Sequence, residues 1–385
     1  MRLARLFKIS LMAVLCGSVG SLVGAEPKTG KKHGEPVNGD LFEAAEVVAL
    51  KIEIPASYLN QLKGDPKTYI RGTLHEGGQA IEKVGIRYKG GLSSPAAAKK
   101  PSFTVKLNEF NGDQRFHGQR KLVLENSLGD PSFLGEMLAN ELFRAAGVPA
   151  ARCAFARVEL NGDDLGLYVM TEGVNRDFLG RYFEKSRGNL YEGDSNDVKD
   201  KLDKDSGDAP KDQSDLAALV EAARELDLAN RWRRLNQVLD VPRFLSFAAM
   251  EVILWNTEGY CLSAKKYRIY HDPGTEKLVF LPHRPEQLFA KPEGDVAPQM
   301  AGLVARAILE TPEGRRQYQQ TLARLLGSVM KVDSLNERIT AWTGRVRPVV
   351  ARGDADSLKA FDQAVAQLRD RLVRRVRFLE QKTKA

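Results

Sequence analysis

The chain has few of the residues that build disulfide frameworks and common metal centres. Its 385 residues include only three cysteines and five histidines. Three cysteines are too few for a disulfide framework, and the histidines are scattered without the spacing of a zinc site. Long apolar runs are also missing after residue 25, so we expect no stable membrane span beyond the N-terminal segment. The sequence leaves open whether Cys153 and Cys261 pair.

A strong excess of one charge is missing as well. The chain has 58 basic and 50 acidic residues, which gives a formal net charge of +8. Its densest basic cluster, residues 369–377, recurs around a predicted helix and is typical of a solvated helix face. We therefore expect no nucleic-acid partner.

The start of the chain has the pattern of an export signal. Three basic side chains open it: Arg2, Arg5 and Lys8. Residues 9–19 are mainly apolar, and small residues end at Ala25, where we expect cleavage. Cys16 follows Leu15 rather than a small residue, which favours a soluble product over a lipoprotein. Cleavage removes three basic residues and no acids, so the net charge falls to +5. We predict a secreted, periplasmic or envelope protein.

The next part of the chain predicts a sheet. Residues 26–40 are polar, with Gly and Pro, and form a predicted flexible leader. Strand patterns separated by Gly-rich turns follow at residues 47–54, 70–74, 81–88 and 103–107. The loop before the last strand carries Gly90, Gly91 and Ser93 between lysines. Glycines let a backbone approach a ligand closely, and hydroxyls with lysines suit phosphate, but a plain hairpin loop explains the same residues.

A strand lysine and a helix glutamate suggest another part of a phosphate site. Alternation over residues 102–107 places Lys106 on the polar face of its strand. Asp130 caps a predicted helix that ends at Gly147, and Glu141 falls on its apolar, core-facing stripe. A buried carboxylate needs a partner, and Lys106 is the predicted one, as in the pair with which protein kinases hold ATP phosphates. The alternatives are a purely structural ion pair or a Glu141 on the helix flank.

The middle of the chain predicts a hairpin and then an insertion. The strongest hairpin signal, Asn161-Gly162, joins two predicted strands, residues 152–160 and 165–171. The second strand runs into Glu172, where a kinase-like order of elements places the backbone that meets adenine. Residues 193–215 are rich in Asp, Lys, Gly and Ser and predict a mobile surface insertion. A calcium loop at residues 203–208 is disfavoured, because the glycine register and final glutamate of an EF-hand are missing.

A predicted core helix, residues 244–255, precedes two acids. The helix is apolar on nearly every face, which predicts burial on all sides. Glu258 follows it, then a predicted hairpin over residues 267–281, then Glu286. Carboxylates on both flanks of a hairpin can aim one at a substrate hydroxyl and the other at a metal, although isolated acids are usually solvated surface groups. From residue 296 onward the pattern is helical.

The order of these motifs and their residues resemble those of the CotH family of secreted, spore-coat-type atypical protein kinases. The resemblance covers most of the mature chain, and the motifs are specific together rather than singly. The segments that carry it are Gly90-Gly91-Leu92-Ser93-Ser94, residues 99–106 (KKPSFTVK), residues 138–144 (LANELFR), Leu160-Asn161-Gly162 with Gly166-Leu167-Tyr168, and Tyr267-Arg268-Ile269-Tyr270 with Pro282-His283. The resemblance implies an α+β, atypical kinase-like fold of two lobes, with ATP between a sheet-rich N-lobe and a helical C-lobe.

The resemblance also implies roles for the predicted site residues. Lys106 would hold the ATP phosphates and take part in catalysis, and Glu141 would orient Lys106. The linker at Glu172 would face adenine. Glu258 would take the position of the catalytic base, and Glu286 the position that holds Mg²⁺ or Mn²⁺.

The chain departs from the family pattern in the catalytic segment. Glu258 and Glu286 stand where similar family members usually carry aspartate, and Lys265 and Lys266 stand where asparagines are usual. An extra methylene moves a carboxylate by about 1 Å. Where the reaction needs a near-attack geometry, such a displacement lowers the rate on the order of a hundredfold. A lysine removes a metal ligand but can neutralise phosphate in place of a metal, so Lys265 is a candidate nucleotide-binding residue.

Three hypotheses follow for function. In the first, an exported protein binds ATP and transfers its γ-phosphoryl group, weakly, to Ser or Thr of secreted or envelope proteins. In the second, it is a pseudokinase that acts as a binding or scaffolding module of the envelope or an extracellular matrix. In the third, it is an adhesin that uses the lobes as a rigid surface. The predicted parts are a signal peptide (1–25), a leader (26–40) and a kinase-like domain (41–385) with an N-lobe (41–175), a C-lobe (176–295) and a helical extension (296–385).

Overall fold

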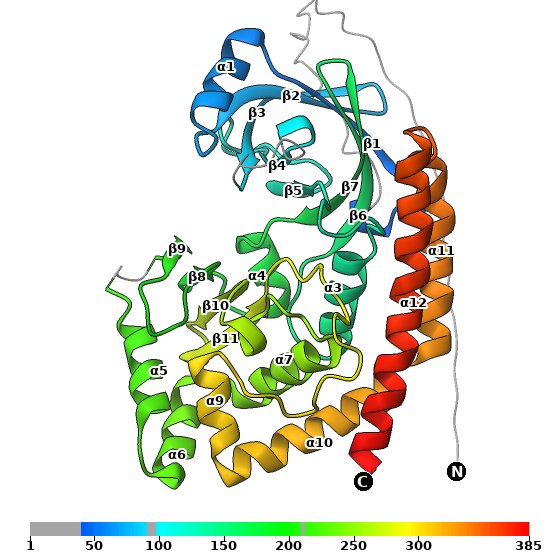
Figure 1. Cartoon of the computed structure of the whole chain (residues 1–385). Helices are drawn as coiled ribbons and strands as arrows, with labels where there is room; N and C mark the ends of the chain where they lie inside the picture. The colour runs from blue at the N-terminus through cyan, green and yellow to red at the C-terminus, as the bar shows by residue number, and fades with distance from the viewer. Residues whose placement is uncertain (1–39, 91–97, 209–211, 385) are drawn as a thin grey trace, which may run out of the picture. The chain divides into compact units, whose positions relative to one another are not determined.

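Strands dominate the first part of the described chain and close into a seven-stranded barrel. The computed structural model describes residues 40–90, 98–208 and 212–384; the predicted signal peptide, nearly all of the leader, and the candidates Gly91 and Ser93 lie outside these ranges. In sheet order the barrel strands are β1 (Val48–Glu53), β2 (Ile70–Glu76), β3 (Gln79–Lys89), β4 (Ser102–Lys106), β5 (Lys121–Glu125), β7 (Asp163–Glu172) and β6 (Cys153–Leu160) (Figure 1). β6 pairs in parallel with β1 and closes the barrel.

Alternation of side chains explains how these strands fill the barrel. In β1 every second residue is buried, Leu50 and Ile52 among them, because successive side chains of a strand point to opposite faces. The β6–β7 hairpin turns at Asn161 and Gly162, whose φ angles of 50° and 91° are the left-handed values that this residue pair favours. The strands predicted in this region are confirmed, whereas β5 is absent from the prediction.

Helices dominate after β7 and surround one small sheet. The order of that sheet is β11 (Lys277–Pro282), β10 (Tyr267–Asp272), β8 (Leu190–Gly193) and β9 (Asp203–Ser206), so β9 lies inside the predicted insertion. The later helices are α4 (Arg176–Tyr182), α5 (Ser214–Arg224), α6 (Leu228–Val238), α7 (Val241–Leu254), α8 (Tyr260–Ser263), α9 (Leu303–Glu310), α10 (Pro312–Ser328), α11 (Val332–Val350) and α12 (Ala355–Lys384). Three short helices accompany the barrel: η1 (Leu41–Glu43), α1 (Ala56–Gly64) and α3 (Gly135–Ala145). The predicted α+β class, sheet-rich first and helical later, is confirmed.

α7 runs through the largest hydrophobic core. All of its residues except Pro242 and Arg243 are buried, as its apolar sequence predicted. The Asp240 side chain accepts a hydrogen bond from the Arg243 N–H at 3.2 Å and caps the helix start. Phe244 packs edge-on against Phe280 of β11, with ring centroids 4.8 Å apart. This packing joins the core helix to the hairpin that precedes Glu286.

α3 begins four residues later than predicted. It starts at Gly135 rather than Pro131, because Phe133 has a φ of 58°, which a right-handed helix does not allow. Asp130 is therefore not the N-cap, a position that Leu134 takes without a side-chain cap, although the Asp130 carboxylate accepts from the Gly135 N–H at 2.7 Å. α3 is buried on nearly every side, so it has no single inward face.

Neither a disulfide nor a membrane helix occurs in the described ranges. Cys153 and Cys261 are both buried free thiols. Within residues 40–90, 98–208 and 212–384, no helix combines the length and apolar character that a membrane crossing requires.

Candidate functional site

The ion pair predicted between Lys106 and Glu141 does not form. Lys106 ends β4, and its ammonium lies 2.6 Å from the carboxylate of Glu109. Glu141 lies on the flank of α3 and pairs with Arg338 of α11 at 3.2 Å. Because α3 is buried almost all round, its apolar stripe does not mark a face toward the barrel. The predicted pair is wrong, and the helix-flank alternative holds for Glu141.

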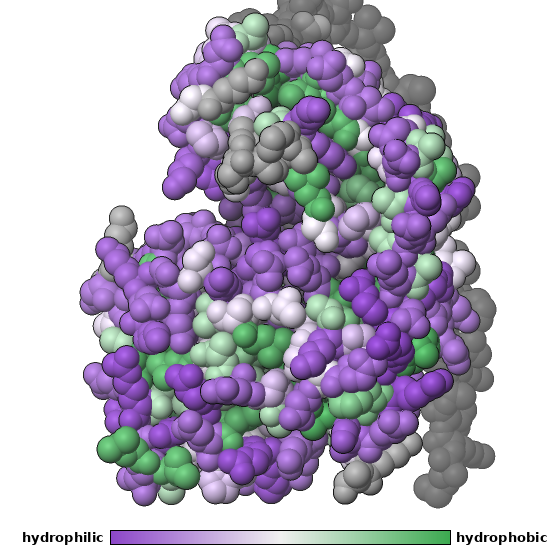
Figure 2. All heavy atoms as spheres, in the orientation of Figure 1, coloured by the Kyte–Doolittle hydropathy of each residue, from purple (hydrophilic) through white to green (hydrophobic). Residues whose placement is uncertain are grey.

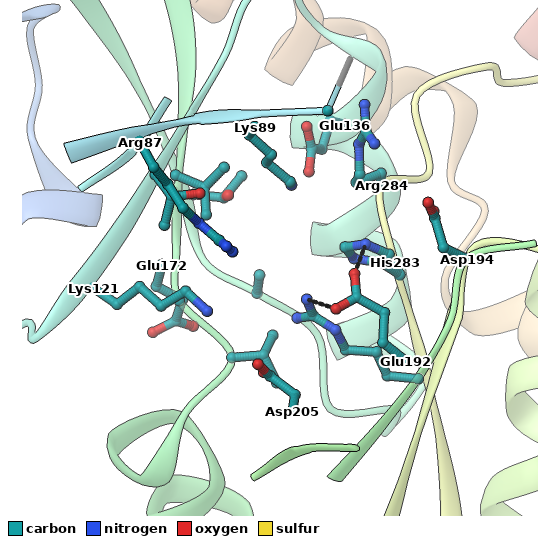
Figure 3. Close-up of a pocket in the computed structure, with 18 of the residues that line it drawn as sticks. Arg87, Lys89, Lys121, Glu136, Glu172, Glu192, Asp194, Asp205, His283 and Arg284 are labelled. Atoms are coloured by element: carbon teal, nitrogen blue, oxygen red, sulfur yellow. Dashed lines mark ion pairs between the residues drawn. The ribbon is translucent and has the colours of Figure 1, made fainter. Parts of the chain in front are cut away.

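A polar cavity of about 480 Å³ lies where the barrel meets the four-stranded sheet. Barrel strands β3, β4, β5 and β7 form one wall, and the small sheet and α3 form the other (Figure 3). Its charged lining residues are Lys67, Arg87, Lys89, Lys121, Glu136, Glu172, Glu192, Asp194, Asp205, Arg268 and Arg284. Gly90 of the predicted phosphate loop also lines it. Figure 2 shows a hollow beside the barrel with hydrophilic residues around it. Lys106 lines a neighbouring hollow that shares Arg87 and Lys121 with this cavity.

Two arginines and one lysine of the cavity keep donor atoms that have no acceptor among the described residues. The Nε atoms of Arg87 and Arg268 are buried, and neither has a hydrogen-bond partner among the described residues. The Lys121 ammonium points into the cavity (Figure 3) and makes no hydrogen bond or ion pair within the part of the chain that the structure describes. Burial lowers the pKa of the Lys121 amine, because desolvation disfavours its charged form. Buried donors without acceptors are costly, so this cavity suits an anion.

Glu192 of β8 holds Arg268 and His283 in place in the cavity wall formed by the small sheet. Its carboxylate lies 3.4 Å from the Arg268 guanidinium and 2.9 Å from Nε2 of His283. The Arg268 charge holds the pKa of Glu192 well below its usual range. Burial lowers the pKa of His283 to about 3, so this imidazole is neutral at pH 7 and donates from Nε2 to Glu192. Glu192 thereby fixes Arg268 but leaves the Nε of that arginine without an acceptor.

A second charged group borders the cavity near α3. Glu125 pairs with Lys89 and lies 3.5 Å from Nε of Arg284. Burial opposes ionisation of Glu125, but Lys89 and Arg284 outweigh it and hold the pKa of this carboxyl below its ordinary value. Glu136 of α3 faces the same cations, and burial with repulsion from Glu125 raises its pKa. Glu136 therefore favours its neutral form more than an exposed glutamate does.

Glu172 stiffens the linker after β7. Its carboxylate accepts from the Arg152 N–H at 2.7 Å and from Arg152 Nε at 3.2 Å, and it pairs with Arg181. The N–H groups of Glu172 and Gly173 donate to the carbonyls of Arg152 and Lys121. A Cβ on Gly173 would lie 2.7 Å from Cβ of Lys121, so the lysine stem packs directly on the linker. The linker thus positions Lys121 at the cavity edge.

Glu258 and Glu286 meet around Lys266. The Lys266 ammonium pairs with Glu258 and lies 3.4 Å from Oε1 of Glu286. Lys265, the predicted nucleotide-binding lysine, is exposed one residue earlier, so Lys266 is the lysine that faces the acids. Mg²⁺ and Mn²⁺ need several oxygen ligands at close range, and an ammonium between the two carboxylates takes that place and repels a cation. The residues as arranged therefore do not fit a divalent metal.

Glu251 of α7 supports the loop that carries Glu258. Its two carboxylate oxygens accept from the N–H groups of Tyr260 at 3.1 Å and Cys261 at 2.6 Å. A Cβ on Gly259 would overlap Oε1 of Glu251, so only glycine allows this close approach. Burial raises the pKa of Glu251 to about 7. The buried helix α7 in this way fixes the loop that carries Glu258.

Sequence reasoning missed several residues of this site, among them Arg87, Arg268, Glu192, Lys121, Glu136 and Lys266. Alternation in residues 121–125 would have placed Lys121 and Glu125 on one strand face, so the β5 pattern was a usable signal. No local pattern shows that this face turns to the cavity. Lys266 was noted only as the neighbour of Lys265, because the residue before a strand has no fixed direction in a sequence.

Comparisons with known proteins agree with the family resemblance. The chain matches the CotH kinase protein family over residues 86–379. Inner spore coat protein H of Bacillus subtilis (strain 168) is 23% identical over 289 residues, which are 69% of this chain and 77% of that protein. A chain of the Shewanella oneidensis MR-1 complex of HipA, HipB and operator DNA is 14% identical, with a TM-score of 0.33, covering 91% of this chain and 76% of that one. The Helicobacter pylori proinflammatory kinase CtkA is 7% identical, with a TM-score of 0.31, covering 70% of this chain and 92% of that one. TM-scores at this level carry no argument about fold or function. The sequence match spans most of the chain, which belongs to the CotH kinase protein family.

Proposed function

We propose that this protein binds ATP in the cavity between the barrel and the four-stranded sheet. The observation that carries the proposal is the set of donors without acceptors: Nε of Arg87, Nε of Arg268 and the Lys121 ammonium. A polyphosphate supplies the acceptors that these groups lack, and a hydrogen bond to a charged group contributes about 1.5–3 kcal/mol. Membership of a kinase family favours a nucleotide over other anions. In this proposal adenine lies at the linker near Gly173.

The same proposal assigns two lobes to the chain. The barrel is the N-lobe, within residues 41–175, and the small sheet with its helices is the C-lobe, within residues 176–295. Residues 296–385 form a helical extension. The support is the position of the cavity, which takes lining residues from both parts.

Calorimetry with ATP tests the binding proposal. Lys121→Met keeps the stem that packs on Gly173 and removes the charge, so we expect ATP affinity to fall by about tenfold, the loss of one good charge-assisted contact. The folded protein should be no less stable, because the substitution removes a desolvated charge. Lys51→Met, on the exposed side of β1, is the control and should bind ATP like wild type. Wild-type protein that does not bind ATP, or a Lys121→Met variant that binds it equally well, contradicts the proposal.

A second candidate function is transfer of the γ-phosphoryl group to Ser or Thr of secreted or envelope proteins. The observation that favours it is the meeting of Glu258 and Glu286 around Lys266, close to Arg284 of the cavity. In this hypothesis Glu258 positions the attacking hydroxyl. Labelled phosphate from ATP should enter the protein itself or a Ser-rich peptide, and Glu258→Gln should abolish the labelling. ATP binding without any labelling supports the pseudokinase alternative, a binding or scaffolding module of the envelope or matrix.

Export is also part of the proposal. Its support is the N-terminal signal pattern, together with a relative that is an inner spore coat protein. N-terminal sequencing of the protein from the medium or the cell envelope should give Glu26 as the first residue. Recovery from the cytoplasm with Met1 or Arg2 at the start would argue against export.

A further inference from the structure

The Lys266 ammonium lies between the carboxylates of Glu258 and Glu286 and is largely shielded from solvent. Glu258 comes from the segment between α7 and α8, and Glu286 from the segment after β11. The side chain of Lys266 is 16% exposed, that of Glu286 18% and that of Glu258 40%. The ammonium therefore lies inside the cluster, with Glu258 on its solvent side.

The backbone directs Lys266 into this position. Its φ of 46° is a left-handed value that a lysine adopts at a cost. Its N–H donates to the Asp194 carbonyl at 3.3 Å, and its own carbonyl accepts from the His283 N–H at 3.3 Å. Both partners line the cavity, so the small sheet fixes Lys266 next to the proposed nucleotide site.

We propose that the Lys266 ammonium takes the place of a divalent cation between Glu258 and Glu286, so that this site works without a metal. One positive charge partly neutralises the two carboxylates, and two of the three ammonium donors are used on them. A metal has to displace this ammonium to reach the carboxylate oxygens, and it meets a like charge as it enters. The third donor remains for an oxygen of the anionic ligand. This last step rests on the proposed binding of ATP.

Titration with Mn²⁺ alone tests the inference without any nucleotide. Free Mn²⁺, followed by electron paramagnetic resonance, should reveal no site at Glu258 and Glu286 in wild-type protein up to about 1 mM. Lys266→Asn removes the competing charge and adds an oxygen ligand, so it should gain one Mn²⁺ site at least about tenfold tighter. Asparagine tolerates the left-handed backbone at this position well, which favours a folded variant. Lys277→Asn removes the same charge at the far end of the β10–β11 hairpin and should behave like wild type.

Two results of this titration would overturn the inference. The first is a wild-type chain that binds one Mn²⁺ and loses it in the Glu258→Gln, Glu286→Gln double variant. The second is a Lys266→Asn variant that has the circular dichroism spectrum of wild type and gains no Mn²⁺ site. If Lys266→Asn does not fold, Lys266→Met replaces it, since it removes the charge and keeps the length of the side chain.

ATP affinity with and without metal gives the second test. We expect wild-type affinity in EDTA and in excess Mg²⁺ to agree within about threefold, and Lys266→Asn to bind at least about tenfold tighter with Mg²⁺ than in EDTA. If wild-type protein binds ATP with Mg²⁺ but not in EDTA, binding requires a metal and the inference is overturned. Absence of ATP binding in both buffers refutes the proposed function instead, and the Mn²⁺ titration then still decides the role of Lys266.

Discussion

Arg375 of α12 should be a main determinant of stability, because it caps the end of the core helix from outside. It is fully buried, and its guanidinium donates to the carbonyls of Val252 at 2.7 Å, Ile253 at 3.1 Å and Pro292 at 3.1 Å, and to that of Gly294. The first two belong to the last turn of α7, where Val252 also accepts from the Trp255 N–H, whereas Ile253 has no other donor among the described residues. Each buried carbonyl left without a donor lowers the free energy of unfolding by about 1–3 kcal/mol. Removing the buried guanidinium also removes the cost of desolvating it, which offsets part of that loss. We therefore expect Arg375→Met to lower the free energy of unfolding by about 3–5 kcal/mol.

Urea denaturation of Arg375→Met beside Arg374→Met checks this value. Arg374 lies one residue earlier, on the exposed side of α12, where it pairs with Glu293. Its loss should leave stability close to that of wild type. Because α7 leads into the loop of Glu258, Arg375→Met should also weaken ATP binding in the fraction that stays folded. A loss below about 1 kcal/mol, or equal losses for the two variants, would refute the capping argument.

Further predictions concern Glu251 and Gly259, which support the loop that carries Glu258. Burial raises the pKa of Glu251 to about 7 from an ordinary 4.5, so the folded protein holds a proton that the unfolded chain releases. The contribution of Glu251 to the free energy of unfolding should therefore be largest below pH 4.5 and fall as the pH rises through about 7, so Glu251→Gln should lose stability relative to wild type at low pH more than at pH 8 in urea titrations. A pH profile identical in both proteins would exclude this role. Gly259→Ala places a methyl group on Glu251 and should lower both the melting temperature and ATP affinity. Gly327→Ala, with open space around its Cα in α10, should add about 0.5–1 kcal/mol of stability. A Gly259→Ala variant as stable as Gly327→Ala would show that the close approach is unimportant.

Elements with strong local signals were predictable from the sequence. The Asn161-Gly162 turn, the alternating strands of the barrel and the uniformly apolar α7 each depend on residues next to one another in the chain. The same holds for the α+β class and for the family, whose motifs lie in short segments. Local conformation and face preference are decided by neighbouring residues, and so they are visible before any contact is known.

Charge partners were not predictable in this way. An apolar stripe suggested that Glu141 points inward, but α3 is buried almost all round, and a distant helix supplies Arg338. Lys106 has a local partner, Glu109, while Lys121 on the next strand has no ion pair among the described residues. A sequence shows which residues carry charge and not which distant groups neutralise them.

The family, the α+β class, most strands of the barrel and the positions of Glu258 and Glu286 in the chain were all available from the sequence. Only the tertiary structure decided that Lys266 stands between those acids and that Arg87, Lys121 and Arg268 share one cavity. The physical reason is that ionisation and pairing depend on distance and burial in three dimensions, and those are set by the packing of elements far apart in the chain.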